Sequence, residues 1–112
     1  MEKVALYRSI AETVIRSTMS EDNKQDPVKE QLIIDERTGN YLLLMNGWQD
    51  ESRFYGCLIH IEVKSNGKVW VHEDRTDLIV VDKLLEKGIT KKDMVIGFHP
   101  PIMREDTEFA IA

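Results

Sequence analysis

The strongest constraint in this sequence is an Asn-Gly dipeptide at positions 66–67, which separates two runs of alternating apolar and polar residues. A two-residue hairpin turn requires positive φ at its central residues, and Asn-Gly satisfies that requirement at little cost. Flanking runs of this kind are typical of paired strands. We therefore expect residues 53–64 and 68–73 to form an antiparallel hairpin.

Further β-rich runs precede this hairpin and extend it to a four-stranded antiparallel meander. Segments with apolar residues at helical spacing lie before and after the strands. Helices on either side of a run of strands indicate an α+β domain, with the helices packed on one face of the sheet. The predicted elements are helix 1–19, loop 20–27, strands 29–36, 40–48, 53–64 and 68–73, and helix 78–87.

The C-terminal third carries end signals and a short tail. Gly88 followed by Ile89 predicts a Schellman motif at the end of the second helix. Residues 90–93 (TKKD) have the spacing of a capping box, and 94–98 are expected to be extended. The apolar stretch 108–112 is expected to dock on the body rather than fray.

Residues 42–45 (LLLM) are apolar on both sides of the predicted strand. A sheet covered on one face alone normally alternates apolar with polar residues. We therefore expect the second face to be covered as well, by the C-terminal segment, by a second copy of the chain in a homo-oligomer, or by a partner.

The length of 112 residues corresponds to one domain, spanning 1–112. The net charge is −5, and basic residues do not cluster. Proteins that neutralise many phosphates usually show a concentrated basic surface, so the charge pattern argues against sequence-specific DNA binding by this chain alone. The single Cys57 and the absence of an apolar leader or membrane segment favour a cytoplasmic protein.

His60, Glu62, His72 and Glu73 are residue types that could build a small metal-binding or hydrolytic site. With a two-residue turn, His60 lies opposite Glu73 and His72 lies opposite Ile61, so the histidines point to opposite sides of the sheet. They could share a metal only if the turn were longer by one residue. We therefore expect no metal and no cofactor, and a small metal-binding or hydrolytic enzyme that uses His60, Glu62 and Glu73 is the alternative function. The preferred interpretation is a cross-strand hydrogen bond between His60 and Glu73.

The other polar candidates have structural explanations. Asp74 and Thr76 precede the second helix, where such side chains cap backbone N–H groups. His99, before two prolines, is expected to cap a carbonyl at a rigid turn. With His60 and Glu73, these residues form a weak candidate polar site, and no catalytic group is evident.

Aromatic residues and arginine are the usual anchors of protein interfaces. Several such residues lie on or near the predicted sheet. The candidate partner-binding residues are Trp48, Arg53, Tyr55, Trp70 and Arg104.

The order of several short motifs resembles the fdxN-element excision controlling factor family, XisI. The motifs are Leu6-Tyr-Arg8, Tyr41 to Met45 followed by Gly47-Trp48, Arg53, Gly56 to Ile61, Gly67 to Val71, Asp74-x-Thr76, Gly88-Ile89, Val95 to Pro101, and the end with Arg104, Thr107 and Phe109 to Ala112.

The resemblance implies a non-catalytic accessory factor, found largely in cyanobacteria. Such a factor is expected to act with a companion, XisH, and a site-specific recombinase in the programmed excision of a DNA element. The resemblance implies no catalytic residues for this component.

Overall fold

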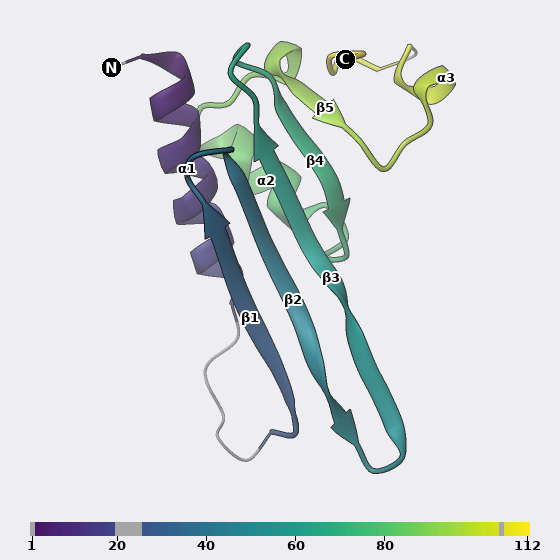
Figure 1. Cartoon of the computed structure of the whole chain (residues 1–112). Helices are drawn as coiled ribbons and strands as arrows, with labels where there is room; N and C mark the ends of the chain where they lie inside the picture. Colours follow the sequence, from purple (N-terminus) through teal and green to yellow (C-terminus); the bar gives the residue numbers. More distant parts are fainter. Residues whose placement is uncertain (1, 20–25, 106) are drawn as a thin grey trace.

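The computed structural model describes residues 2–19, 26–105 and 107–112 (Figure 1). Both predicted helices and all four predicted strands are present within two residues of their expected bounds, while residues 20–25 of the predicted loop lie outside the described residues. The elements are α1 (Lys3–Thr18), β1 (Val28–Asp35), β2 (Asn40–Gln49), β3 (Ser52–Val63), β4 (Val69–Asp74), α2 (Ile79–Glu86), the short 3-10 helix η1 (Lys91–Asp93), β5 (Met94–Ile96) and α3 (Pro101–Arg104).

The sheet has five strands in the order β1-β2-β3-β4-β5. Strands β1 to β4 form the expected antiparallel meander, but β5 pairs with β4 in parallel, so the sheet is mixed rather than purely antiparallel. Helix α2 belongs to the crossover that a parallel connection requires. Of the residues 94–98 that were expected to be extended, 94–96 form this buried edge strand and 97–98 lie in a turn. The prediction included neither β5 in the sheet nor helix α3.

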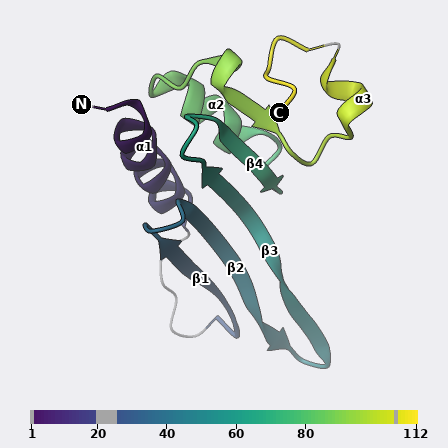
Figure 2. The ribbon, with the colours of Figure 1, turned by 45° about the horizontal axis from the view of Figure 1, so that its top comes forward.

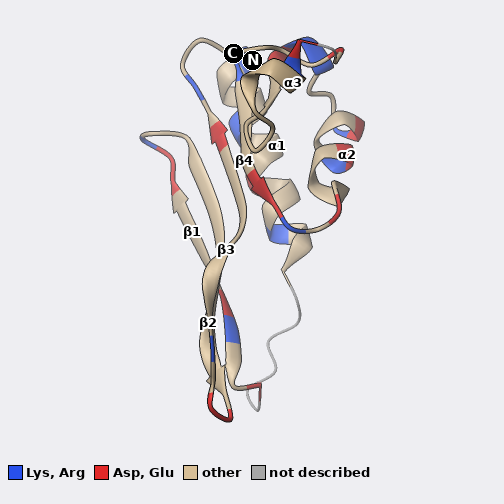
Figure 3. Cartoon of the chain, turned by 90° about the vertical axis from the view of Figure 1, so that its right-hand side faces the viewer, with Lys and Arg blue, Asp and Glu red and all other residues tan. Residues whose placement is uncertain are grey.

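Helices α1 and α2 cover one face of the sheet, as predicted (Figure 3). The core lies between these layers and contains fully buried side chains such as Ile15, Leu43, Ile61 and Leu84. Helix α3 lies outside this layer, beyond β5 (Figures 1 and 2). The opposite side of the sheet, here called the outer face, has neither α1 nor α2 against it.

The β3–β4 turn contains three residues rather than the predicted two. Val63 pairs with Val69, and the N–H of Lys64 donates to the Lys68 carbonyl at 2.9 Å. Gly67 has the expected positive φ of +86°. A bulge then places His72 as an extra residue on β4, because its neighbours pair in consecutive order on β3. The predicted pairing of β3 with β4 is therefore wrong by one residue between the turn and the bulge, and correct beyond the bulge.

Both ends of α2 are stabilised as predicted. The Asp74 carboxylate accepts the N–H of Thr76 at 2.9 Å and of Val81 at 3.4 Å, and the Thr76 hydroxyl also donates to it. At the other end, the N–H of Ile89 donates to the Leu84 carbonyl at 3.2 Å, and Gly88 has φ +115°. Together with the bond from the Gly88 N–H to the Leu85 carbonyl at 3.1 Å, this bond defines a Schellman motif, which satisfies carbonyls at the helix end.

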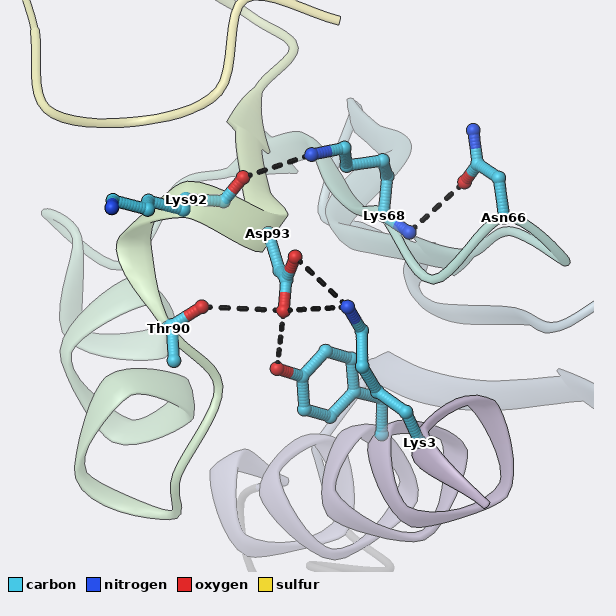
Figure 4. A network of polar contacts seen from close by, with 7 residues as sticks. Lys3, Asn66, Lys68, Thr90, Lys92 and Asp93 are labelled. Carbon is cyan, nitrogen blue, oxygen red and sulfur yellow. Dashed lines mark hydrogen bonds and ion pairs between the residues drawn. The ribbon is translucent and has the colours of Figure 1, made fainter.

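One carboxylate joins α1 to η1 (Figure 4). Asp93 accepts a hydrogen bond of 2.6 Å from the Tyr7 hydroxyl, one of 3.1 Å from Lys3 Nζ and one of 3.2 Å from the Thr90 hydroxyl. Within the expected capping box, the Thr90 hydroxyl thus bonds the Asp93 side chain rather than backbone. Burial by itself raises the pKa of Asp93. The hydrogen bonds from Tyr7 and Lys3, the charge of Lys3 and the hydrogen bond from Thr90 together outweigh burial and hold the pKa below its ordinary value.

The variant Asp93→Asn is expected to be less stable by about 1–3 kcal/mol at pH 7, because it loses a charged acceptor. The folded-state pKa is depressed, so the charge stabilises the fold above the unfolded-state value, about 3.9, and this contribution fades as pH falls through the folded-state value. Urea titrations at pH 7 and pH 3 measure the difference. A gap between variant and wild type that widens at pH 3 would contradict this assignment.

The apolar C-terminus docks as predicted. The N–H of Ala110 donates to the Met94 carbonyl at 2.8 Å, and Phe109 packs against the core. This contact supplies a partner to the short edge strand β5. Among the described helices, none is long and apolar enough to cross a membrane.

Candidate interaction site

The outer face continues along a hairpin that projects past the helices. The lower ends of β2 and β3 extend beyond α1 and α2 (Figures 1 and 2). Because Tyr41 and Leu43 are buried towards the helices, the alternate residues Leu42, Asn46 and Trp48 belong to the outer face. The end of this hairpin therefore presents its outer-face side chains away from the body.

Three of the predicted partner-binding residues gather there and are named the tip cluster: Trp48, Arg53 and Tyr55. Trp48 and Arg53 are opposite each other across β2 and β3. The Arg53 guanidinium lies 5.6 Å from the Trp48 ring centroid and 5.1 Å from that of Tyr55, within the range of cation–π attraction. The rings remain 55% and 62% exposed.

Backbone and side-chain contacts fix the arginine of the tip cluster. Arg53 Nη1 donates to Asn46 Oδ1 at 3.0 Å and to the Gly47 carbonyl at 3.1 Å. A guanidinium held between two rings loses little freedom when a partner binds, which favours affinity. Large exposed aromatic rings next to an ordered arginine are the composition of interface hot spots.

The remaining two predicted residues form a separate cluster. The Arg104 guanidinium lies 5.1 Å from the Trp70 ring centroid, and Lys64 Nζ lies 4.6 Å from it. Arg104 is held by the carbonyls of His99 at 3.0 Å and Gly97 at 3.3 Å. The C-terminal segment thus covers this part of the outer face.

The two clusters lie far apart on the same face. Trp70 pairs with Glu62, which pairs with Asn40, and Trp48 is eight residues further along β2. At the rise of a strand, this separation is about 26 Å. The predicted five-residue patch is therefore two patches. Between them runs an apolar strip of exposed Ile33 and half-buried Leu42 and Leu44.

The two histidines share the outer face, contrary to prediction. The longer turn and the bulge place the His60 and His72 ring centroids 4.6 Å apart. His60 Nε2 lies 2.8 Å from Asn40 Oδ1, so its partner is not Glu73, although those two residues do pair across the strands. His72 Nε2 lies 2.8 Å from Glu62 Oε1. Burial, and then the neighbouring His72, lower the pKa of His60.

This proximity does not produce a metal-binding arrangement. Among the described residues, no group of three or more His, Cys, Asp or Glu side chains has the geometry to hold a metal ion. His60 and His72 instead each bond a neighbouring side chain across β2 or β3.

The other members of the weak polar site do not converge on one point. Asp74 and Thr76 cap α2, on the helix side of the fold. The His99 ring packs edge-on against Phe98, with centroids 4.8 Å apart, and the His99 carbonyl, not the ring, accepts the bond from Arg104. The expectation that the His99 ring caps a carbonyl is therefore not met among the described contacts.

The sequence model of the XisI protein family matches residues 1–111. The chain belongs to the XisI family. The crystal structure of fdxN element excision controlling factor XisI from Anabaena variabilis ATCC 29413 is 38% identical, with a TM-score of 0.85 over 99% of this chain and 100% of that one. A XisI-like protein from the same organism is 29% identical, with a TM-score of 0.83 and the same coverage. No curated protein matches the chain.

In this XisI-family protein, Cys57 has the surroundings of an unreactive thiol. Burial first, and then the charge of Glu73, raise the pKa of Cys57, and its Sγ lies 3.2 Å from the Ile59 carbonyl oxygen. Nucleophilic cysteines need a lowered pKa, so the environment of Cys57 opposes that role.

The sequence prediction missed the residues that order the two clusters. Asn46 fixes Arg53, and Lys64 contacts the face of Trp70. Asn46 precedes a Gly-Trp pair, but nothing in that local pattern indicates its partner across the strands. Lys64 lies two residues from Glu62 and therefore on the same face of the sheet, and Glu62 pairs with Trp70. A correct strand register could have indicated the contact between Lys64 and Trp70.

Proposed function

We propose that this protein is a non-catalytic controlling factor of DNA element excision that acts through contact with a XisH-like partner, with the tip cluster as its main contact. The observation that carries the proposal is the exposed Trp48–Arg53–Tyr55 arrangement on a hairpin that projects from the body. Family membership supports the controlling role, since a structural relative bears that description. The outer-face histidines bond side chains of the sheet rather than a shared centre, which agrees with a non-enzymatic role.

Co-purification with a XisH-like companion tests the proposal. We expect the wild-type chain to be retained at micromolar concentration and the double variant Trp48→Ala, Tyr55→Ala to bind at least about tenfold more weakly, because hot-spot truncations commonly cost 2 kcal/mol or more. Ile102→Ala is the control, since this α3 side chain is 75% exposed and lies away from the tip.

Two results would sink the proposal. One is a companion that never co-purifies with the wild-type chain. The other is a double variant that binds as well as the control. Light scattering of the chain alone tests a further case, in which the tip cluster joins two copies of this chain instead. In that case the wild type is a dimer and the double variant is a monomer.

We expect this chain alone to show no sequence-specific binding to duplex DNA. Basic and acidic positions are interspersed along the ribbon (Figure 3), and the net charge is −5, so few phosphates can be neutralised together. A gel-shift titration of the wild-type chain at about 150 mM salt, where weak phosphate contacts are screened, measures this. Submicromolar binding in the presence of competitor DNA would contradict the expectation.

A further inference from the structure

A polar groove lies on the helix side of the molecule, well away from the tip cluster. It has a volume of about 590 Å³, which is within the usual range for small-molecule sites. One wall is α1 and the other is formed by β2 and the β1–β2 turn. Its chemistry-bearing lining residues include Arg8, Ser9, Glu12, Thr13, Glu36 and Tyr41.

Arg8 is the unusual member of this lining. Its Nε is buried without a hydrogen-bond partner, and within the described residues the guanidinium makes no hydrogen bond or ion pair. Of the five N–H donors of a guanidinium, the one on Arg8 Nε is both buried and unpaired, which is costly. Structural arginines normally spend these donors on carboxylates or carbonyls, as Arg53 and Arg104 do in this chain.

The β1–β2 turn is shaped around this guanidinium. A Cβ built on Gly39 would lie 3.1 Å from Arg8 Nε and 3.2 Å from Arg8 Nη2. Because Gly39 has no side chain, the Arg8 guanidinium can lie directly against the turn. The side chain is held in place by packing while its donors stay unused, which is the state of a pre-organised binding group.

The charges of the groove select among possible ligands. Arg16 is paired with Glu12 at 3.0 Å, whereas Arg8 and Glu36 have no partner among the described residues. Burial raises the pKa of the nearby Tyr41, with Arg8 opposing and Glu12 and Glu36 adding to the rise, so its hydroxyl stays protonated. The groove thus combines the unpaired guanidinium of Arg8 with the carboxylates of Glu2 and Glu36 and with several hydroxyl groups, and its acidic residues disfavour polyanions.

We propose that this groove binds a small zwitterion of the α-amino acid class, with the ligand carboxylate on Arg8 and the ligand ammonium on the side of Glu36. A guanidinium binds a carboxylate through two parallel N–H bonds, the geometry that distinguishes arginine from lysine. Nε stays covered by the Gly39 turn, so the two terminal nitrogens, Nη1 and Nη2, make this contact. Ser9, Thr13 and Tyr41 line the same groove and add hydroxyl groups to it.

Saturation-transfer NMR with a pool of the standard α-amino acids, followed by calorimetric titration of the best binder, tests the site. We expect saturable binding that weakens about tenfold or more in Arg8→Met, which keeps the chain length but has no donors. Arg37→Gln is the matched control, because it removes an exposed arginine from the same turn without touching the groove. Its affinity should equal that of wild type.

Analogues and stability provide independent readouts. Removing the ligand carboxylate, as in the corresponding amine, should abolish binding, and N-acetylation should weaken it about tenfold. The Tm of Arg8→Met should equal or exceed that of wild type, because an unpartnered buried donor is removed. The proposal is overturned if no amino acid binds the wild-type chain at millimolar concentration, with or without a lower Tm in Arg8→Met. It is also overturned if Arg8→Met binds the amino acid as tightly as wild type does, or if wild type binds the amine as tightly as the amino acid.

Discussion

Replacing Asp74 with alanine is expected to lower the free energy of unfolding by about 2–4 kcal/mol, because it removes the acceptor for several N–H and O–H donors at once. Asp74 is only 8% exposed and accepts from Thr76 and Val81. Helix α2 begins after two residues with positive φ, Asp77 and Leu78, and Leu78 offers no capping side chain. The cap is therefore supplied from the end of β4.

Urea titration at pH 7 measures the loss. Asp82→Ala is the control, because Asp82 is an exposed acidic residue in the first turn of the same helix. It should change stability by less than about 1 kcal/mol, the scale of an exposed charge near a helix N-terminus. Equal losses in the two variants would contradict the capping role of Asp74.

Gly39→Ala is expected to cost about 2–4 kcal/mol, through backbone strain and a steric clash. Gly39 has φ +73°, and an added Cβ would lie 2.3 Å from the Val63 carbonyl oxygen. The contact cannot open easily, because the Val63 N–H also donates to the Gly39 carbonyl at 2.8 Å. The added methyl group must therefore displace the junction between this turn and the end of β3.

Gly56→Ala is the matched comparison for this substitution. The nearest atom to a Cβ at Gly56 is Arg75 Nη1 at 3.5 Å, which is ordinary contact with a flexible side chain. We expect a change of less than about 1 kcal/mol there. Thermal and urea unfolding of the two variants rank the positions, and a Gly56→Ala protein less stable than Gly39→Ala would contradict this description of the turn.

The local elements were predictable because their signals lie within a few residues. Runs rich in β-branched, Leu and aromatic residues predicted β1 to β4, and Gly88-Ile89 predicted the end of α2 with its hydrogen bonds. Strand β5 was not assigned to the sheet, because three apolar residues carry no periodicity and parallel pairing depends on the path of the whole crossover.

The histidine geometry shows how a single residue changes a predicted site. The Asn-Gly signal was correct about the position of the turn but not about its length. One extra loop residue, compensated by a bulge at His72, brought His72 beside His60. A shift of one residue in the register moves every side chain of a strand to the other face of the sheet. A bulge that causes such a shift is not visible in alternation alone.

The five residues predicted to bind a partner do not form one patch. Trp48, Arg53 and Tyr55 do assemble, because two of them pair directly and the third follows on the same face. Trp70 and Arg104 belong to a different end of the sheet, since Arg104 reaches it from a C-terminal segment whose path the sequence did not indicate.

Hydrogen–deuterium exchange of the wild-type chain, with and without a XisH-like companion, tests the central claim most directly. We predict that bound companion slows exchange in residues 44–57, which carry the tip cluster, and leaves α2 and residues 101–105 unchanged. Slowed exchange confined to α2 or the C-terminal segment, with 44–57 unaffected, would contradict the assignment of the tip cluster as the contact surface.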